Sequence, residues 1–188
     1  MSYQLFHLRD STSSHAQRML GVLKQRARQL DHWGIFPGVF GLGTNEAYWV
    51  VQGDSMVCPI HADDQLELIE QVSLNPTVRP KEYAPRSKPG IYVFRWFEVE
   101  ASKIDQVVAL SDQAWGAFEG GFDTEIQGLF TVQPRFDRYA MVLVTWYRNL
   151  TVWQDSREPD PSAKQLFVER QMLLDSARPI ATRLELVD

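Results

Sequence analysis

The stretch YAMVLVTWYRNLTVWQDSREPD, residues 139–160, decides the fold. It opens with an apolar run at 139–147, breaks at Arg148 and continues with the spacing of a helix. Asn149 forms the glycosylation sequon Asn149-Leu150-Thr151, but we interpret it as the N-cap of the short helix that follows. The stretch therefore predicts a strand that leads directly into a helix.

The predicted strand at 139–147 is apolar on both of its alternating faces, whereas a strand with one wet face shows polar residues at every second position. Helices can cover one face. A second sheet is the economical cover for the other, because an exposed apolar patch of that size is costly. We therefore expect two sheets packed face to face. The two sets are Tyr139, Met141 and Leu143, and Ala140, Val142, Val144 and Trp146.

The rest of the chain predicts the same order of elements twice. In the first half, strands are expected at 3–9, 35–42 and 47–51 and helices at 16–31 and 63–72, the latter capped by Asp63. In the second half, strands are expected at 91–99, 126–132, 139–147 and 180–187 and helices at 102–119, 149–153 and 162–174. This is the split βαβ, or ferredoxin-like, order.

An overlay of the two halves supports an internal repeat, with coincidence between similarly built α+β segments as the alternative. YQLFHLRD from Tyr3 aligns with IYVFRWFE from Ile91, and Tyr48 aligns with Tyr139. The predicted fold is α+β, with two tandem ferredoxin-like repeats whose antiparallel sheets pack face to face. The expected units are a first repeat at 1–75, a proline-rich linker at 76–90 and a second repeat at 91–188.

Composition excludes several classes of protein. The net charge of −5 and the pI of about 5.4 argue against a nucleic-acid partner. A lone cysteine, Cys58, cannot form an intramolecular disulfide and fits a reducing compartment. Residues 1–10 lack an apolar signal core, and no segment approaches the roughly 18 apolar residues of a membrane span. We expect a cytoplasmic protein with no membrane partner.

The second half resembles NIPSNAP-type proteins of the dimeric α+β barrel superfamily. VLVTWYRNLTVWQDSRE, residues 142–158, is similar to that family's strand with a terminal aromatic pair, followed by a short helix with an arginine near its end. The helix at 162–174 and the closing ATRLELV are also similar, but a Pro-x-Trp common after the short helix is missing. The resemblance implies a barrel with a cavity, completed by an equivalent sheet, here as a pseudo-dimer within one chain. It does not imply one chemistry.

His7 and Arg95 are the candidate catalytic residues, because each interrupts an apolar strand and the overlay makes them equivalent. A polar group in a core costs several kcal/mol unless it is paired. Either both line the cavity, His7 as a base and Arg95 as a fork for a carboxylate, or each has a structural partner, such as Glu98 or Glu100 for Arg95. Whether they face one cavity is open at this point.

Four aromatic residues are the candidate ligand contacts: Trp96, Trp146, Tyr147 and Tyr139. They form either a flat-sided pocket or plain core. His61, Asp63 and Asp64 lack a second cluster, so we expect no metal site. We expect no cofactor either, because the second half has no histidine for haem and the chain has no phosphate-binding loop.

Two functions remain open, and a haem protein is a third and weaker idea. The first is binding of a small apolar or aromatic ligand between the sheets, or a role in assembly as a homo-oligomer through the closing strand. The second is a cofactor-independent monooxygenase or isomerase for an aromatic or quinol-like substrate. That reaction needs one base and one anion-stabilising donor in the same cavity.

Overall fold

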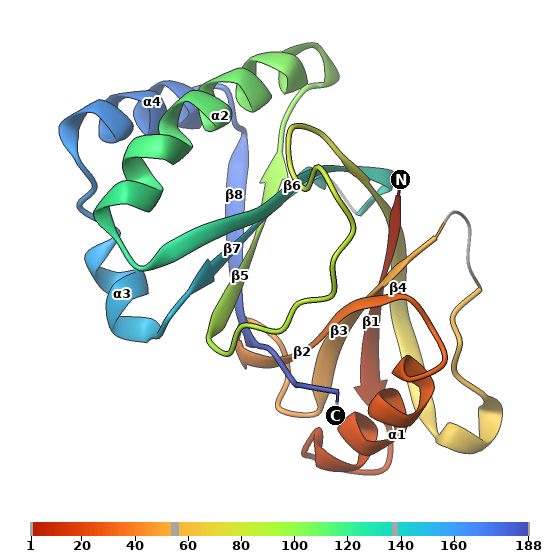
Figure 1. Cartoon of the computed structure of the whole chain (residues 1–188). Coiled ribbons are helices and arrows are strands. Elements are labelled where there is room, and N and C mark those ends of the chain that lie inside the picture. Colours follow the sequence, from red (N-terminus) through yellow and green to blue (C-terminus); the bar gives the residue numbers. More distant parts are fainter. Residues whose placement is uncertain (1, 54–56, 137–138, 188) are drawn as a thin grey trace.

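The computed structural model describes residues 2–53, 57–136 and 139–187, and its arrangement is drawn in Figure 1. The strands in these residues are β1 (Tyr3–Asp10), β2 (His32–Phe40), β3 (Glu46–Gln52), β4 (Leu66–Pro76), β5 (Ile91–Glu98), β6 (Thr124–Phe136), β7 (Tyr139–Tyr147) and β8 (Ser176–Arg183). The α-helices are α1 (Gln17–Ala27), α2 (Ile104–Gly121), α3 (Leu150–Asp155) and α4 (Pro161–Gln171). Two short 3-10 turns, Ala62–Asp64 and Ala101–Lys103, precede β4 and α2.

The described strands close into one antiparallel barrel, in the order β1-β3-β2-β8-β5-β7-β6-β4. Each half contributes four neighbouring strands, β4-β1-β3-β2 and β8-β5-β7-β6, so the order within both halves is the same. The halves join where Gly38 of β2 pairs with Thr182 of β8 and Ser73 of β4 pairs with Gln133 of β6. The predicted pair of separate sheets packed face to face is therefore corrected to one sheet closed on itself, which leaves no free edge among these strands. The repeat itself stays a prediction.

The barrel interior is filled with side chains. A single buried cluster takes residues from all of the eight strands and consists largely of aromatic rings. Eight strands give an interior just wide enough for side chains to fill. The fully buried rings of this cluster are Tyr3, Trp33, Phe36, Tyr48, Tyr92, Phe94, Trp96 and Phe130.

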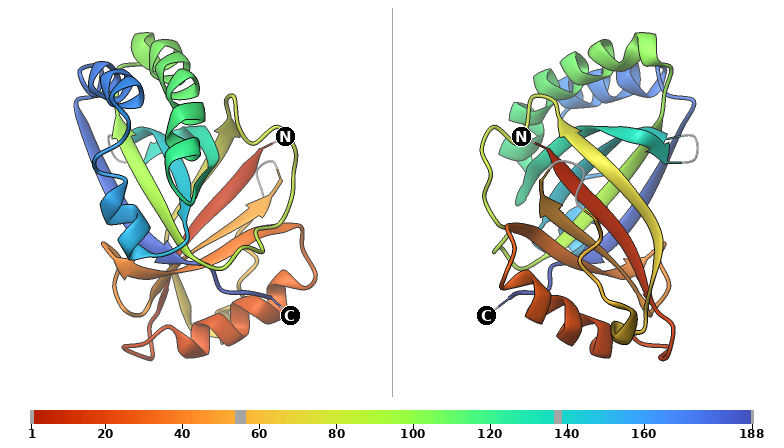
Figure 2. Two further views of the ribbon diagram at one scale, coloured as in Figure 1. Left: turned by 60° about the vertical axis from the view of Figure 1, so that its left-hand side comes forward. Right: turned by 90° about the vertical axis from the view of Figure 1, so that its right-hand side faces the viewer.

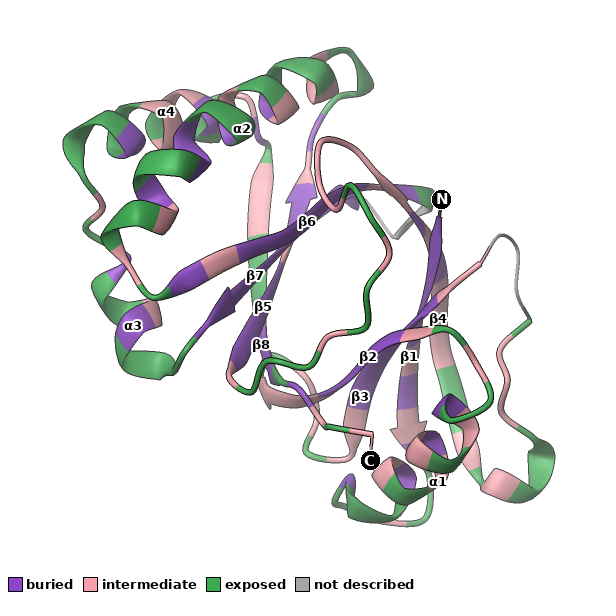
Figure 3. Ribbon diagram, viewed as in Figure 1, coloured by how far each residue is buried: buried purple, intermediate pink, exposed green. Residues whose placement is uncertain are grey.

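Helices cover the outside of the barrel in two separate groups (Figures 1 and 2). The helix α1 packs Met19 and Leu23 against the outer face of β1 and β3. The helices α2, α3 and α4 pack against the outer face of β5 to β8. Every residue of β7 is buried, as Figure 3 shows, which confirms the prediction that this strand is covered on both faces.

Two helix signals had different outcomes. The Asn149 side chain accepts a hydrogen bond of 3.0 Å from the Val152 amide, so its predicted role as the N-cap of α3 is confirmed. The helix predicted at 63–72 is wrong, because β4 occupies this region and Asp63 lies in the 3-10 turn. The spacing of Leu66, Ile69 and Val72 fits either structure, and pairing with β1 and β6 decides for a strand.

None of the helices in the described ranges is both long and apolar enough to cross a bilayer.

We predict that Gly90→Ala destabilises the protein by about 1–3 kcal/mol, because Gly90 has a φ of +151°. A Cβ at this position would also lie inside van der Waals contact of the Trp146 indole nitrogen and the Tyr147 carbonyl. Gly116→Ala, in the middle of α2, is the control, since a Cβ there has no neighbour within 4 Å. Urea unfolding of both variants checks this, and equal stabilities would contradict the prediction.

Candidate functional site

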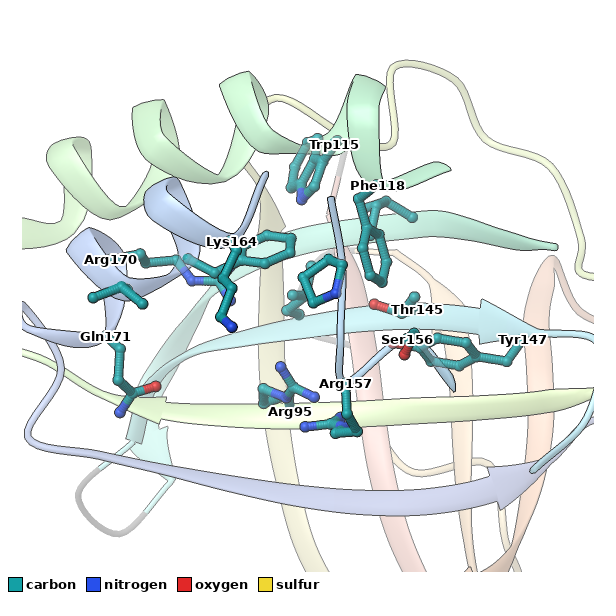
Figure 4. Close-up of a pocket in the computed structure, with 15 residues that line it drawn as sticks. Arg95, Trp115, Phe118, Thr145, Tyr147, Ser156, Arg157, Lys164, Arg170 and Gln171 are labelled. Carbon is teal, nitrogen blue, oxygen red and sulfur yellow. The ribbon is translucent and has the colours of Figure 1, made fainter. Parts of the chain in front are cut away.

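A pocket of about 300 Å³ lies outside the barrel, between the outer face of β5, β6 and β7 and the helices above it (Figure 4). Arg95, Thr145 and Tyr147 rise from the strands, and Trp115 and Phe118 descend from α2. The turn after α3 and the inner face of α4 complete the walls. The volume is at the lower end for small-molecule sites.

Arg95 enters this pocket because of the alternation of side chains along β5. Its neighbours Phe94 and Trp96 belong to the barrel interior, so Arg95 must face outward. Burial lowers the pKa of Arg95, an effect that Tyr147 opposes and the positive charge of Arg157 reinforces. Neither of the predicted structural partners pairs with it: Glu98 accepts a hydrogen bond from Ser176, and Glu100 pairs with Lys103.

Arg170 reaches the pocket from α4 and is almost completely buried, with 5% of its surface exposed. Its Nη1 donates to Ser111 Oγ at 3.2 Å, and its Nε has no hydrogen-bond partner among the residues that the structure describes. The guanidinium lies 4.9 Å from the centre of the Phe167 ring and 5.3 Å from that of Phe97. Burial, with a further contribution from Arg95, lowers the pKa of Arg170 to about 10, so the group stays charged at neutral pH.

The pocket has a strong positive charge. Four cationic side chains line it, and no described lining residue is an aspartate, a glutamate or a histidine. Among the described residues, none of the four forms an ion pair with a carboxylate. Arg95 projects from β5 in Figure 4, and the charge of Arg157, from the turn after α3, acts on it. The four are Arg95, Arg157, Lys164 and Arg170.

His7 lies elsewhere, and the overlay that made it equivalent to Arg95 is wrong. Its Nε2 is 3.1 Å from Glu46 Oε2, and its ring lies edge-on to Tyr48 at 5.1 Å. Tyr3 and Leu5, at the same alternating positions of β1, face the barrel interior, so His7 lies on the opposite side of the sheet from Arg95. Burial lowers the pKa of His7, and Glu46 opposes this effect. The two residues share no cavity.

Of the four predicted aromatic contacts, the structure brings only Tyr147 to the pocket. Trp96, Trp146 and Tyr139 belong to the packed barrel interior. Trp146 donates its indole N–H to the Pro89 carbonyl at 3.0 Å and thereby ties the 76–90 segment to the barrel. These three residues are therefore part of the packed core, which was the alternative to a pocket. A ligand-binding role for any of the four aromatic residues stays a prediction.

Sequence reasoning missed three of the four cations. Arg157 was visible in the motif at 142–158, and Arg170 lies three residues after Phe167 on a helix whose face packs inward. A charge at that spacing on a buried stripe is the signal that could have identified Arg170. Lys164 carried no comparable signal. No group of three or more potential metal-binding side chains occurs within the described residues.

No known protein family and no curated protein matches the chain. Solved structures do match it along almost the whole length. A candidate monooxygenase of Lactobacillus acidophilus NCFM is 11% identical, with 99% of this chain and 96% of that chain covered and a TM-score of 0.62. An anthrone oxidase-like protein is 9% identical (98% and 92% covered, TM-score 0.60). A haem-binding protein of Thermus thermophilus is also 9% identical (99% and 91% covered, TM-score 0.57).

At such low identities these likenesses show the fold alone. The chain has an α+β barrel fold that these solved structures share, in which antiparallel strands form the barrel and helices cover its outside. An α+β barrel is the fold that the resemblance of residues 142–158 implied.

Proposed function

We propose that this protein binds a small ligand with a flat apolar body in the pocket between β5–β7 and the helices α2 and α4. The observation that carries the proposal is the contrast between two spaces. The barrel interior, where the sequence placed the ligand, holds a packed cluster of rings. The outer pocket is hollow, with Trp115, Phe118 and Phe167 in its walls. Aromatic walls with a few polar groups are typical of ligand sites.

Tryptophan fluorescence tests this location. A naphthalene-based ligand in the pocket is expected to quench the emission of Trp115. Trp115→Phe should lose that part of the quenching and keep an aromatic wall, whereas Trp33→Phe, in the barrel interior, should retain it. Binding at 100 times the dissociation constant should also stabilise the protein by about 2.7 kcal/mol. Quenching that disappears with Trp33→Phe instead would place the ligand inside the barrel and contradict the proposal.

Membership of the NIPSNAP-type family is part of this proposal. The NIPSNAP-like segment at 142–158 supports it, because this segment supplies Tyr147, Ser156 and Arg157 to the pocket. The division into ferredoxin-like repeats at 1–75 and 91–188 and a location in the cytoplasm are proposed with it. Assembly through the closing strand has less support, because β8 is already paired with β2 and β5 of its own chain. A homo-oligomer built in another way remains a prediction.

A cofactor-independent monooxygenase or isomerase is the second candidate. Arg95 supports it, because a guanidinium in the pocket could stabilise an enolate or phenolate. The pocket lining contains no histidine, aspartate or glutamate among its described residues that could serve as the base. Binding without catalysis is therefore favoured. Oxygen uptake with a set of quinols tests the alternative, and turnover that Arg95→Gln abolishes would replace the binding function with an enzymatic one.

A further inference from the structure

We propose that the ligand carries an anionic group, a carboxylate or a phosphate, which Arg95 and Arg170 hold between the sheet and α4. This inference rests on the proposed function and adds the chemical class of the ligand. It follows from three properties of the pocket: the buried charge, the sign of the surrounding charges and the shape of the apolar walls.

Arg170 is buried in the pocket, and Arg95 is partly buried there. Removing a guanidinium from water is costly unless a counter-charge compensates it, and in the described structure neither Arg95 nor Arg170 has a carboxylate partner. The two cations also disfavour each other, since Arg95 adds to the lowering of the pKa of Arg170. Leu143, which lies beside Arg95 across the β5–β7 pairing, shows that an apolar residue fits this surface. A bound anion would supply the missing counter-charge.

The surrounding charges have the same sign. Arg157 and Lys164 add two cations to the lining, although the whole chain has a net charge of −5. Positive charge concentrated in a hollow with low-dielectric walls attracts anions from solution. A neutral ligand would not compensate these positive charges.

The apolar walls define the rest of the ligand. The centre of the Phe167 ring lies 4.9 Å from the Arg170 guanidinium, and Trp115 points from α2 into the pocket in Figure 4. A planar guanidinium binds a carboxylate or a phosphate through two parallel hydrogen bonds. The arrangement therefore fits an aromatic acid or an aromatic phosphate ester whose ring lies among the pocket's aromatic side chains.

A set of three ligands tests the inference with the wild-type protein. 2-Naphthoate, 2-naphthyl phosphate and the neutral 2-naphthamide share one ring system, and titration calorimetry at pH 7 gives their affinities. Charge-assisted hydrogen bonds contribute about 1.5–3 kcal/mol, so an anion should bind at least about tenfold more tightly than the amide. The tighter of the two anions identifies the carboxylate or the phosphate as the preferred group.

Variants assign the effect to the pocket. Arg95→Gln should weaken binding of the anions about tenfold or more and leave the amide unchanged, and Arg95→Lys should keep part of the anion affinity. Arg183→Gln removes an exposed cation of β8 that does not line the pocket and should bind like wild type.

The outcomes separate the two proposals. Equal affinities of the wild-type protein for the amide and both anions would overturn the inference and leave ligand binding intact. This comparison stands even if Arg95→Gln fails to fold. If none of the three binds, the proposed function falls, and the inference falls with it.

Discussion

Phe94→Ala should lower the free energy of unfolding by about 3–5 kcal/mol, the usual cost of removing a buried phenylalanine ring. Phe94 is completely buried in the barrel interior, where its ring centre lies 5.1 Å from that of Phe36 and 5.2 Å from that of Tyr48. These two partners belong to β2 and β3, so the ring joins the two halves of the chain. The cavity left by alanine would lie between rings that cannot collapse freely onto it.

Urea unfolding measures this change, and Phe40→Ala is the matched control. Phe40, at the end of β2, has 59% of its surface exposed, so its truncation should change stability by less than about 0.5 kcal/mol. The comparison also tests the architecture. A small effect of Phe94→Ala would mean that the barrel interior is loosely filled. A ligand site in the space between the two halves would then be favoured over the outer pocket.

Asp10→Asn should destabilise the protein by about 3 kcal/mol at pH 7, because it removes the buried member of an ion pair. Asp10 is completely buried. Arg18 donates from Nε to Oδ2 at 2.9 Å and from Nη2 to Oδ1 at 2.7 Å, and the amide and hydroxyl of Thr12 donate to Oδ1. The expected loss of stability lies at the low end of the range for broken buried ion pairs, because the Arg18 side chain is 38% exposed and water screens its charge.

The loss should depend on pH in a defined direction. Burial by itself would raise the pKa of Asp10, but the hydrogen bonds from Arg18 and Thr12 outweigh it, so the pKa lies below its ordinary value of 3.8. The stabilisation is therefore complete above about pH 4 and is lost as the pH falls through the lowered pKa. The difference between wild type and Asp10→Asn should shrink below pH 4.

Unfolding at pH 7 and at pH 3 checks both statements. Glu100→Gln is the control for loss of an acidic charge, because Glu100 is 61% exposed in its pair with Lys103 and should contribute less than about 0.5 kcal/mol. A difference between wild type and Asp10→Asn that grows towards low pH would contradict the assignment of a lowered pKa.

Local sequence determined much of the fold. The run at 139–147 is apolar on both faces, and this pattern requires cover on both sides of the strand, whatever the partners are. Asn149 caps α3 through a hydrogen bond to a residue only three positions away, so the formation of this cap depends little on the rest of the chain. Such features depend on neighbours in the sequence and can be predicted from the sequence alone.

Tertiary structure decided the features that depend on which strands meet. The segment Leu66–Pro76 has a spacing compatible with a helix, but the barrel can close only if this segment pairs with β1 and β6 as a strand. The positions of His7 and Arg95 depend on a register that the overlay missed by one residue, and such a slip moves a side chain to the opposite face of a sheet. The pocket shows the same limit. Arg95 and Arg170 are 75 positions apart in the sequence, and they come close only because α4 packs over β5.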